Sequence, residues 1–222
     1  MPPRQRPIAP ASLVLYDDPL SPWCLVAEQR LRAVLEDFPG AFRPLRIEPF
    51  ATRREPRALC KTDRRDLARA ARRAAREPEA ARTTPELWLS PDPPLSSLPA
   101  LTALAAARLQ GPAQEGALRQ AIRQAALERG LNVARTDVLL ELAERAGLDL
   151  HRFASAFGTP AVEQRVRAVL EEALERGVRQ VPALVIGESW LVAGARDADE
   201  YRAILHRYLS TEVGLPPLRT LH

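Results

Sequence analysis

Apolar residues form short continuous runs near both ends of the chain and recur at helical spacing between them. Residues 12–16 are a short β-rich run between proline and Asp17-Asp18-Pro19, which predicts a buried strand. Residues 24–35 follow a helical pattern, and residues 42–47 predict a second strand, at an edge or a bulge because it contains Pro44. This order is a βαβ unit, whose right-handed crossover makes its two strands parallel.

The middle of the chain, residues 62–177, shows no convincing strand pattern. Four segments have helical periodicity and are separated by glycines: residues 100–109, 114–128, 136–146 and 160–176. The pattern is clearest in the last segment, where Val162, Val166 and Leu170 lie on one face. This block is therefore predicted to be a helical bundle of about 100 residues.

Strands return near the end of the chain. Two apolar runs, residues 183–186 and 190–192, flank Gly187-Glu188-Ser189, which is typical of a β-hairpin. A helix follows, with Asp197 as its N-cap and Glu200 three residues later in the manner of a capping box. Neither end of the chain buries a core alone, so the two ends must share one sheet, and the helical block is an insertion.

We therefore predict an α/β fold: a mixed four-stranded sheet with a large inserted all-helical domain. The expected limits are residues 11–57 and 178–210 for the sheet domain, residues 58–177 for the insertion, and residues 211–222 for a loosely attached, proline-rich tail.

The composition is that of an ordinary folded protein and excludes some classes of function. Of 222 residues, 46% are hydrophobic and 27% are charged, and the net charge is only +4 despite a pI near 9.6. The dense basic run at residues 64–76 has no interleaved aromatic residue, which favours a solvated helix over a nucleic-acid site. There is no apolar run of membrane-spanning length, and the apolar stretch 13–15 is too short for a signal peptide. We expect a cytoplasmic protein without a membrane or nucleic-acid partner.

Neither the cysteines nor the histidines predict a metal site. The two cysteines, Cys24 and Cys60, are too few for a disulfide framework, and the sequence leaves open whether they meet. The three histidines, His151, His206 and His222, share no metal-ligand spacing, so no metal cofactor is expected.

The segment Ser21-Pro22-Trp23-Cys24 lies at the predicted strand-to-helix turn and is the first candidate site. Serine is a favoured N-cap residue, and proline at the first helical position loses no hydrogen bond. A thiolate at a helix N-terminus is stabilised by unpaired N–H groups and by the helix dipole. Here the first position carries a hydroxyl and Cys24 lies one turn deeper, so Ser21 and Cys24 are the candidate catalytic residues.

Two motifs resemble those of the DsbA/FrnE-like thioredoxin-fold family. The segment 21–24, preceded by Tyr-Asp-Asp-Pro at residues 16–19, is similar to the family's D-x-x-C-P-W-C motif. Residues 177–186, followed by Gly194-Ala195, are similar to its G-V-x-G-V-P-x-F-x-I…G-A block. The resemblance covers residues 11–210 and implies a thioredoxin fold. It also implies that the usual dithiol cycle is lost, because Ser21 stands where the family has its nucleophilic cysteine, and Cys24 keeps only the resolving position.

The related kappa-class glutathione transferases and 2-hydroxychromene-2-carboxylate isomerases have a serine at the same place. In these enzymes the serine donates a hydrogen bond to the thiolate of bound glutathione, which implies the same role for Ser21. Pro22 and Trp23 would lie beside the bound cofactor. In the alternative interpretation Ser21 is only a helix cap and Trp23 only packs in the core.

The resemblance also implies a cis proline at Pro182. The backbone of Val181 could then pair with glutathione or with an extended peptide as an added strand. In the alternative interpretation Pro182 only begins a strand. Arg196 and Asp197 occupy the region that holds the γ-glutamyl end in the kappa class, although the usual serine–aspartate pair of that class is replaced by Gly194-Ala195.

Three functions stay open at this point. The favoured one is a glutathione-dependent transferase, isomerase or oxidoreductase that uses Ser21. The second is a disulfide oxidoreductase acting through Cys24, alone or with Cys60. The third is a non-catalytic protein that binds peptides at the Val181–Pro182 edge. The expected partners are a small thiol, a peptide or a small-molecule substrate, and a homodimer is left open.

Overall fold

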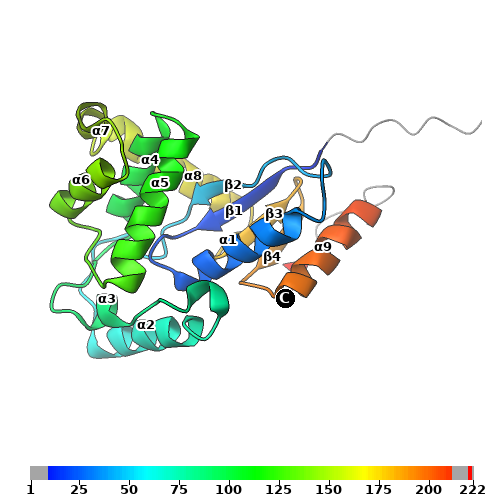
Figure 1. Ribbon diagram of the computed structural model, residues 1–222, viewed down its shortest axis with the longest axis horizontal. Coiled ribbons are helices and arrows are strands. Elements are labelled where there is room, and N and C mark those ends of the chain that lie inside the picture. The colour runs from blue at the N-terminus through cyan, green and yellow to red at the C-terminus, as the bar shows by residue number, and fades with distance from the viewer. Residues whose placement is uncertain (1–9, 212–219, 222) are drawn as a thin grey trace, which may run out of the picture.

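The computed structural model describes residues 10–211 and 220–221, which form a mixed sheet flanked by helices (Figure 1). The strand order is β2-β1-β3-β4-β5. The strands are β1 (Leu13–Asp17), β2 (Arg46–Pro49), β3 (Ala183–Ile186), β4 (Trp190–Ala193) and β5 (Thr220–Leu221). β1 pairs in parallel with β2 and antiparallel with β3, β3 pairs antiparallel with β4, and β4 pairs in parallel with β5. The predicted four-stranded mixed sheet is confirmed, and β5 adds a short fifth strand at its edge.

Strands β1 and β3 are buried along their whole length, because helices cover both faces of the sheet. These helices are α1 (Pro22–Leu35) and α9 (Ala198–Thr211) on one face and α8 (Pro160–Glu175) on the other. Leu13 and Leu15 pack against α1 and α9, whereas Val14 and Tyr16 pack against α8. Successive side chains of a strand point to opposite faces, so an uninterrupted apolar run suits a strand covered on both sides.

The chain between β2 and α8 is helical and packs around a core of its own. Its elements are α2 (Lys61–Ala74), the 3-10 turn η1 (Pro78–Ala80), α3 (Glu86–Leu89), α4 (Leu98–Arg108), α5 (Pro112–Arg123), the π-helical turn η2 (Gln124–Glu128), α6 (Thr136–Arg145) and α7 (Leu150–Ala156). Leu118, Ile122, Leu139 and Phe153 lie in the centre of this core and are fully buried. This unit, cyan to green in Figure 1, is the predicted helical insertion.

Two elements depart from their predicted bounds. The second strand is Arg46–Pro49 instead of residues 42–47. Pro44 has no N–H to contribute to a ladder, and Phe42 forms only an isolated bridge with Ala11. The helix predicted over residues 114–128 begins at Pro112 and widens into the π-helical turn at Gln124.

The predicted tail, residues 211–222, begins inside α9, which ends at Thr211. Residues 212–219 and 222 lie outside the described residues, while Thr220–Leu221 pair with β4. The limits of the insertion at residues 58 and 177 stay a prediction. Within residues 58–177, α8 packs on the sheet, whereas the preceding helices pack mainly on one another.

Candidate functional site

Three segments of the chain meet at one end of the sheet and carry the residues that the sequence singled out. β3 runs antiparallel to β1, so its beginning lies beside the end of β1, where Tyr16 pairs with Ala183. β4 returns antiparallel to β3 and brings Ala193 opposite Ala183. The Gly194 N–H then donates to the Pro182 carbonyl over 2.8 Å. The turn after β1, the segment before β3 and the segment after β4 are therefore neighbours.

Ser21 occupies the N-cap position of α1, but its side chain does not cap the helix. The residue has an extended backbone, with φ −96° and ψ 114°, and Pro22 begins the helix as predicted. Its backbone N–H donates to the Asp18 carbonyl, whereas its hydroxyl accepts no hydrogen bond from the first turn. The interpretation of Ser21 as only a helix cap therefore lacks the hydrogen bond that defines such a cap.

Cys24, the other residue predicted to be catalytic, is 0% exposed. Burial raises the pKa of its thiol well above the usual range, and the nearby Asp17 carboxylate raises it further, while hydrogen bonding with Ser21 opposes the rise. Cys60 is exposed at the start of α2, and neither cysteine is in a disulfide. The motif thus contains a neutral buried thiol, and the role predicted for Cys24 in disulfide exchange stays a prediction that this geometry does not favour.

The segment after β4 lies against α1, beside the motif. Trp23 is half-buried and packs in the same small apolar cluster as Ala195, which agrees with the packing role considered for it. The Arg196 carbonyl accepts a hydrogen bond from Arg30 on α1, but the Arg196 Nε is buried and has no hydrogen-bond partner among the described residues. Asp197 faces solvent, and its backbone N–H donates to the Glu200 carboxylate as in the predicted capping box. Arg196 therefore lies at the site, and Asp197 lies at its rim.

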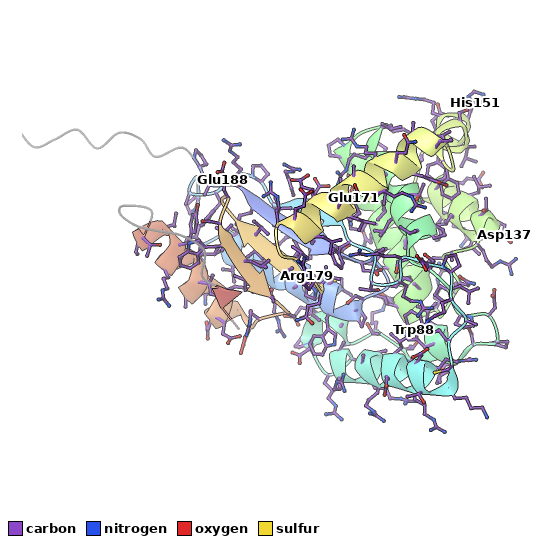
Figure 2. The ribbon with its side chains drawn as sticks, turned by 180° about the vertical axis from the view of Figure 1, so that it is seen from behind. Trp88, Asp137, His151, Glu171, Arg179 and Glu188 are labelled. Carbon is purple, nitrogen blue, oxygen red and sulfur yellow. The ribbon has the colours of Figure 1, made fainter. Side chains whose placement is uncertain are left out.

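The Val181–Pro182 peptide bond is cis, as predicted, and a groove of about 770 Å³ lies beside it. The groove separates residues 50–57, which follow β2, from residues 179–181. Its charged residues are four arginines and one acid: Arg53, Arg54, Arg57, Arg179 and Glu55. Arg179 lies beside the sheet, just beyond the end of α8 (Figure 2). This excess of positive charge suits the carboxylates of a bound ligand.

Asp18, which the sequence marked as part of a strand boundary and of the segment that precedes the motif, holds the motif loop (residues 18–21, between β1 and α1) in place. Its buried carboxylate accepts hydrogen bonds from the Leu20 N–H at 2.9 Å, the Thr52 N–H at 2.8 Å and the Ser97 hydroxyl at 2.6 Å. Burial raises the pKa of Asp18, and the bonds from Ser97 and Thr52 oppose that rise. Because Thr52 follows β2 and Ser97 precedes α4, one side chain joins the motif loop to the sheet and to the insertion.

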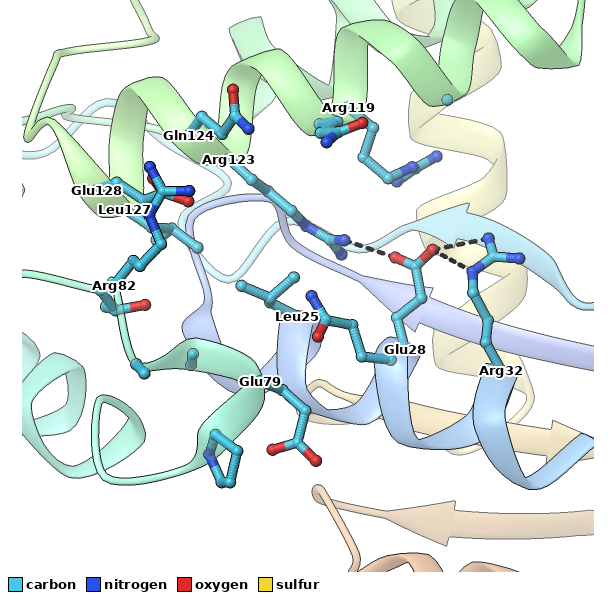
Figure 3. Close-up of a pocket in the computed structure, with 17 residues that line it drawn as sticks. Leu25, Glu28, Arg32, Glu79, Arg82, Arg119, Arg123, Gln124, Leu127 and Glu128 are labelled. Carbon is cyan, nitrogen blue, oxygen red and sulfur yellow. Dashed lines mark hydrogen bonds and ion pairs between the residues drawn. The ribbon is translucent and has the colours of Figure 1, made fainter.

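A buried set of ion pairs joins the same end of β1 to the insertion. Asp17 is 0% exposed and binds Arg119 at 2.9 Å and Arg123 at 2.7 Å, both on α5. Arg123 also binds Glu28 on α1, and Glu28 binds Arg32 (Figure 3). Sequence reasoning missed this network. The sequence feature that points to it is the spacing of Arg119 and Arg123, four residues apart, which places both on one helix face. That spacing does not identify Asp17 as their partner.

Within the part of the chain that the structure describes, no group of three or more His, Cys, Asp or Glu side chains could hold a metal ion. His151 lies on α7 at the outer end of the insertion (Figure 2). In the same described residues, no helix has both the length and the apolar character needed to cross a bilayer.

Two curated relatives align with most of this chain. The first is the ClpXP adapter protein SpxH of Halalkalibacterium halodurans, 28% identical in an alignment of 188 residues that covers 82% of this chain and 60% of that protein. The second is the ClpXP adapter protein SpxH of Bacillus subtilis, 28% identical in an alignment of 215 residues that covers 93% of this chain and 70% of that protein. The chain therefore spans less than two thirds of the length of the first of these relatives.

Solved structures share this fold over nearly the whole chain. A putative protein disulfide isomerase from Nitrosomonas europaea has a TM-score of 0.75 at 21% identity, over 90% of this chain and 98% of that chain. The cytosolic disulfide reductase DsbM from Pseudomonas aeruginosa has a TM-score of 0.64 at 20% identity, over 91% and 98%. A 2-hydroxychromene-2-carboxylate isomerase has a TM-score of 0.61 at 18% identity, over 91% and 98%. A family model, the DSBA-like thioredoxin domain, matches residues 12–206. The chain therefore belongs to the DSBA-like thioredoxin domain family.

Proposed function

We propose that this protein binds glutathione with its sulfur beside Ser21 and acts as a glutathione-dependent transferase, isomerase or oxidoreductase. The observation that carries the proposal is the state of the motif at the start of α1. Ser21 presents a hydroxyl that does not cap the helix, while the thiol of Cys24 is buried. The motif thus offers a hydrogen-bond donor to the sulfur of a ligand and no accessible thiol of its own.

A thiolate beside Ser21 is stabilised by two features of the chain. The first is the N-terminus of α1, a 14-residue helix whose first N–H groups and dipole favour negative charge. The second is the Ser21 hydroxyl, whose charge-assisted hydrogen bond contributes about 1.5–3 kcal/mol. A neutral Cys24 thiol supports this arrangement, because a neutral sulfur is a weak acceptor and does not compete with a ligand thiolate for the Ser21 hydroxyl proton.

The remaining groups of glutathione have matching partners on both sides of the motif. Val181 is half-buried, and its backbone N–H and carbonyl make no hydrogen bond with another described residue. They are therefore open to pair with a peptide backbone. The two carboxylates of glutathione suit the Nε of Arg196 and the arginine-lined groove beside Val181.

When bound, glutathione would supply the nucleophilic thiolate that the motif lacks. The part of the chain is to hold the sulfur in its deprotonated form and to align the peptide backbone. DsbM from Pseudomonas aeruginosa, which has this fold at 19% identity and a TM-score of 0.58, has been solved with GSH. We also propose a cytoplasmic location, where thiols are kept reduced, in keeping with two cysteines outside any disulfide.

The test compares Ser21→Ala with Ser155→Ala, which removes an exposed hydroxyl on α7. Calorimetry measures glutathione binding, and the ultraviolet absorbance of the thiolate, titrated against pH, gives the pKa of bound glutathione. Ser21→Ala should raise that pKa by roughly one to two, because about 1.36 kcal/mol corresponds to a change of one. Ser155→Ala should leave the pKa unchanged. If the wild-type protein does not bind glutathione, the proposal fails; an unchanged pKa in Ser21→Ala would leave Ser21 without its role.

A second function, a non-catalytic adapter that binds an extended acidic peptide along Val181, is favoured by the positive charge of the groove. Both curated relatives are named as ClpXP adapter proteins. In this case an acidic peptide binds, its charge-reversed counterpart does not, and glutathione does not compete. Arg54→Ser in the groove should weaken peptide binding, whereas Arg152→Ser, an exposed arginine on α7, should not.

A further inference from the structure

A cavity separate from the motif lies between α1 of the sheet domain and the insertion (Figure 3). It has a volume of about 460 Å³, which is within the range of small-molecule sites. α1 forms one wall, α5 and the π-helical turn η2 form another, and residues 78–83 close the end. Leu25 and Leu127 give it an apolar floor.

The cavity wall contains a buried hydrogen-bond donor without a partner. Arg123 is only 7% exposed, and its side chain reaches from the end of α5 toward Glu28 (Figure 3). Its terminal nitrogens bind Asp17 and Glu28, but its Nε has no hydrogen-bond partner in the part of the chain that the structure describes. Leaving a buried donor unsatisfied is unfavourable, so an acceptor supplied by a ligand would stabilise this site.

A glycine lies at the rim of the cavity. Gly116 is exposed and lies in the interior of α5, where glycine destabilises a helix by roughly 0.5–1 kcal/mol relative to alanine. Its φ is not in the left-handed region, and a Cβ added there would meet nothing within 4 Å. Neither strain nor close packing therefore requires glycine at this position. The adjacent turn η2 is π-helical, and such turns are frequent at functional sites.

The charged side chains that line the cavity are already in ion pairs, so the polar groups left for a ligand are the Arg123 Nε and neutral amides. Four arginines and three glutamates line it: Arg32, Arg82, Arg119, Arg123, Glu28, Glu79 and Glu128. Both oxygens of Glu28 are already bound by arginines. In contrast, the side-chain amides of Gln29, Gln120 and Gln124 make no hydrogen bond with any other described residue.

We propose that this cavity is a binding site for a small organic carboxylate that also carries an amide or hydroxyl group. The carboxylate binds at the Nε of Arg123, the glutamine amides bind the neutral polar groups, and the apolar floor takes the body of the molecule. Through Arg123 such a ligand would contact the ion pairs of Asp17, directly before the motif loop. This site is independent of glutathione binding at Ser21.

The test uses N-acetyl-L-leucine, which has one carboxylate, one amide and an apolar side chain, and its uncharged methyl ester as the matched probe. Nuclear magnetic resonance spectra of the ¹⁵N-labelled full chain follow the Arg123 Nε–H signal and the backbone amides of Gln124 and Leu127. The acid should shift these signals saturably, with a Kd on the order of 1 mM as expected for so small a ligand. The ester should bind at least about tenfold more weakly, because it lacks the charge that the arginine recognises.

Two variants separate binding in the cavity from binding elsewhere. Gly116→Leu places a side chain in the open space, whereas Gly116→Ala adds only a methyl group, and both improve the helix propensity of α5. Gly116→Leu should weaken binding of the acid at least about tenfold, and Gly116→Ala should retain it. The proposal is overturned if the acid causes no saturable shift, if the ester binds equally well, or if Gly116→Leu binds as the wild type does.

Discussion

Replacing Asp17 by asparagine tests whether buried ion pairs hold the insertion against the sheet. Asp17 is 0% exposed, and its two oxygens accept hydrogen bonds from Arg119 at 2.9 Å and Arg123 at 2.7 Å. Asparagine has the same shape, but it keeps one acceptor oxygen and turns an NH₂ group toward the other guanidinium. Both arginines remain buried, each with a single carboxylate partner left, Glu115 or Glu28.

The expected loss follows from this geometry. Removing one partner of a buried ion pair costs about 3–5 kcal/mol, because the remaining charge stays desolvated. Since each arginine retains one carboxylate, we expect the lower part of that range, about 3 kcal/mol. Urea denaturation followed by far-ultraviolet circular dichroism measures the free energy of unfolding from the midpoint and slope.

The matched control is Asp137→Asn. Asp137 binds Arg135 at 2.7 Å, but both side chains are more than half exposed. Solvent screens such a pair, so this variant should unfold at the same urea concentration as the wild type. If Asp17→Asn changes the free energy of unfolding by less than about 1 kcal/mol, a typical value for any substitution, the buried network does not stabilise the fold as argued.

Three further predictions concern other buried groups. Burial raises the pKa of Tyr201 to about 12 from an ordinary value of 10.0, so the stability that the neutral phenol contributes is present below pH 10 and is lost as the pH rises toward 12. In alkaline denaturation, Tyr201→Phe should remove this part of the pH dependence of the free energy of unfolding. Gly187 has φ +60°, and a Cβ there would clash with the Tyr208 hydroxyl, whereas a Cβ at Gly147, where φ is +75°, would meet nothing within 4 Å; thermal unfolding should therefore show that Gly187→Ala is more destabilising than Gly147→Ala. Ellman's reagent should modify the exposed Cys60 in the folded protein and Cys24 only after unfolding; fast modification of Cys24 would contradict its burial.

The fold could be predicted largely because its elements follow local patterns. The continuous apolar runs that become β1 and β3 and the periodic segments that become α4, α6 and α8 reflect the geometry of single strands and helices. The errors occurred where local pattern was a poor guide. The second strand begins after Pro44 and ends at Pro49, later than predicted, because proline cannot donate a ladder hydrogen bond. The π-helical turn that begins at Gln124 was predicted as α-helix, because the two have similar apolar patterns.

The candidate site was predicted in part. Placing Ser21 at the start of α1 and Pro182 before β3 needed only a motif and an element order. The antiparallel pairing of β1 and β3 brings the two segments to the same end of the sheet. The sequence placed Cys24 one turn deeper than Ser21, but its complete burial and the uncapped Ser21 hydroxyl depend on how α1 is covered by the rest of the chain.

The sequence by itself thus determined the order of the elements, the helical nature of the insertion and the position of the motif, since these depend on contacts between near neighbours and on backbone periodicity. Only the tertiary structure decided which charges meet. Asp17 is 102 residues from Arg119 and 106 from Arg123, and Asp18 is 79 residues from Ser97. A charged side chain inside a predicted helix or strand shows no preference for a distant partner until packing removes water from both, and it is this desolvation that makes their pairing necessary.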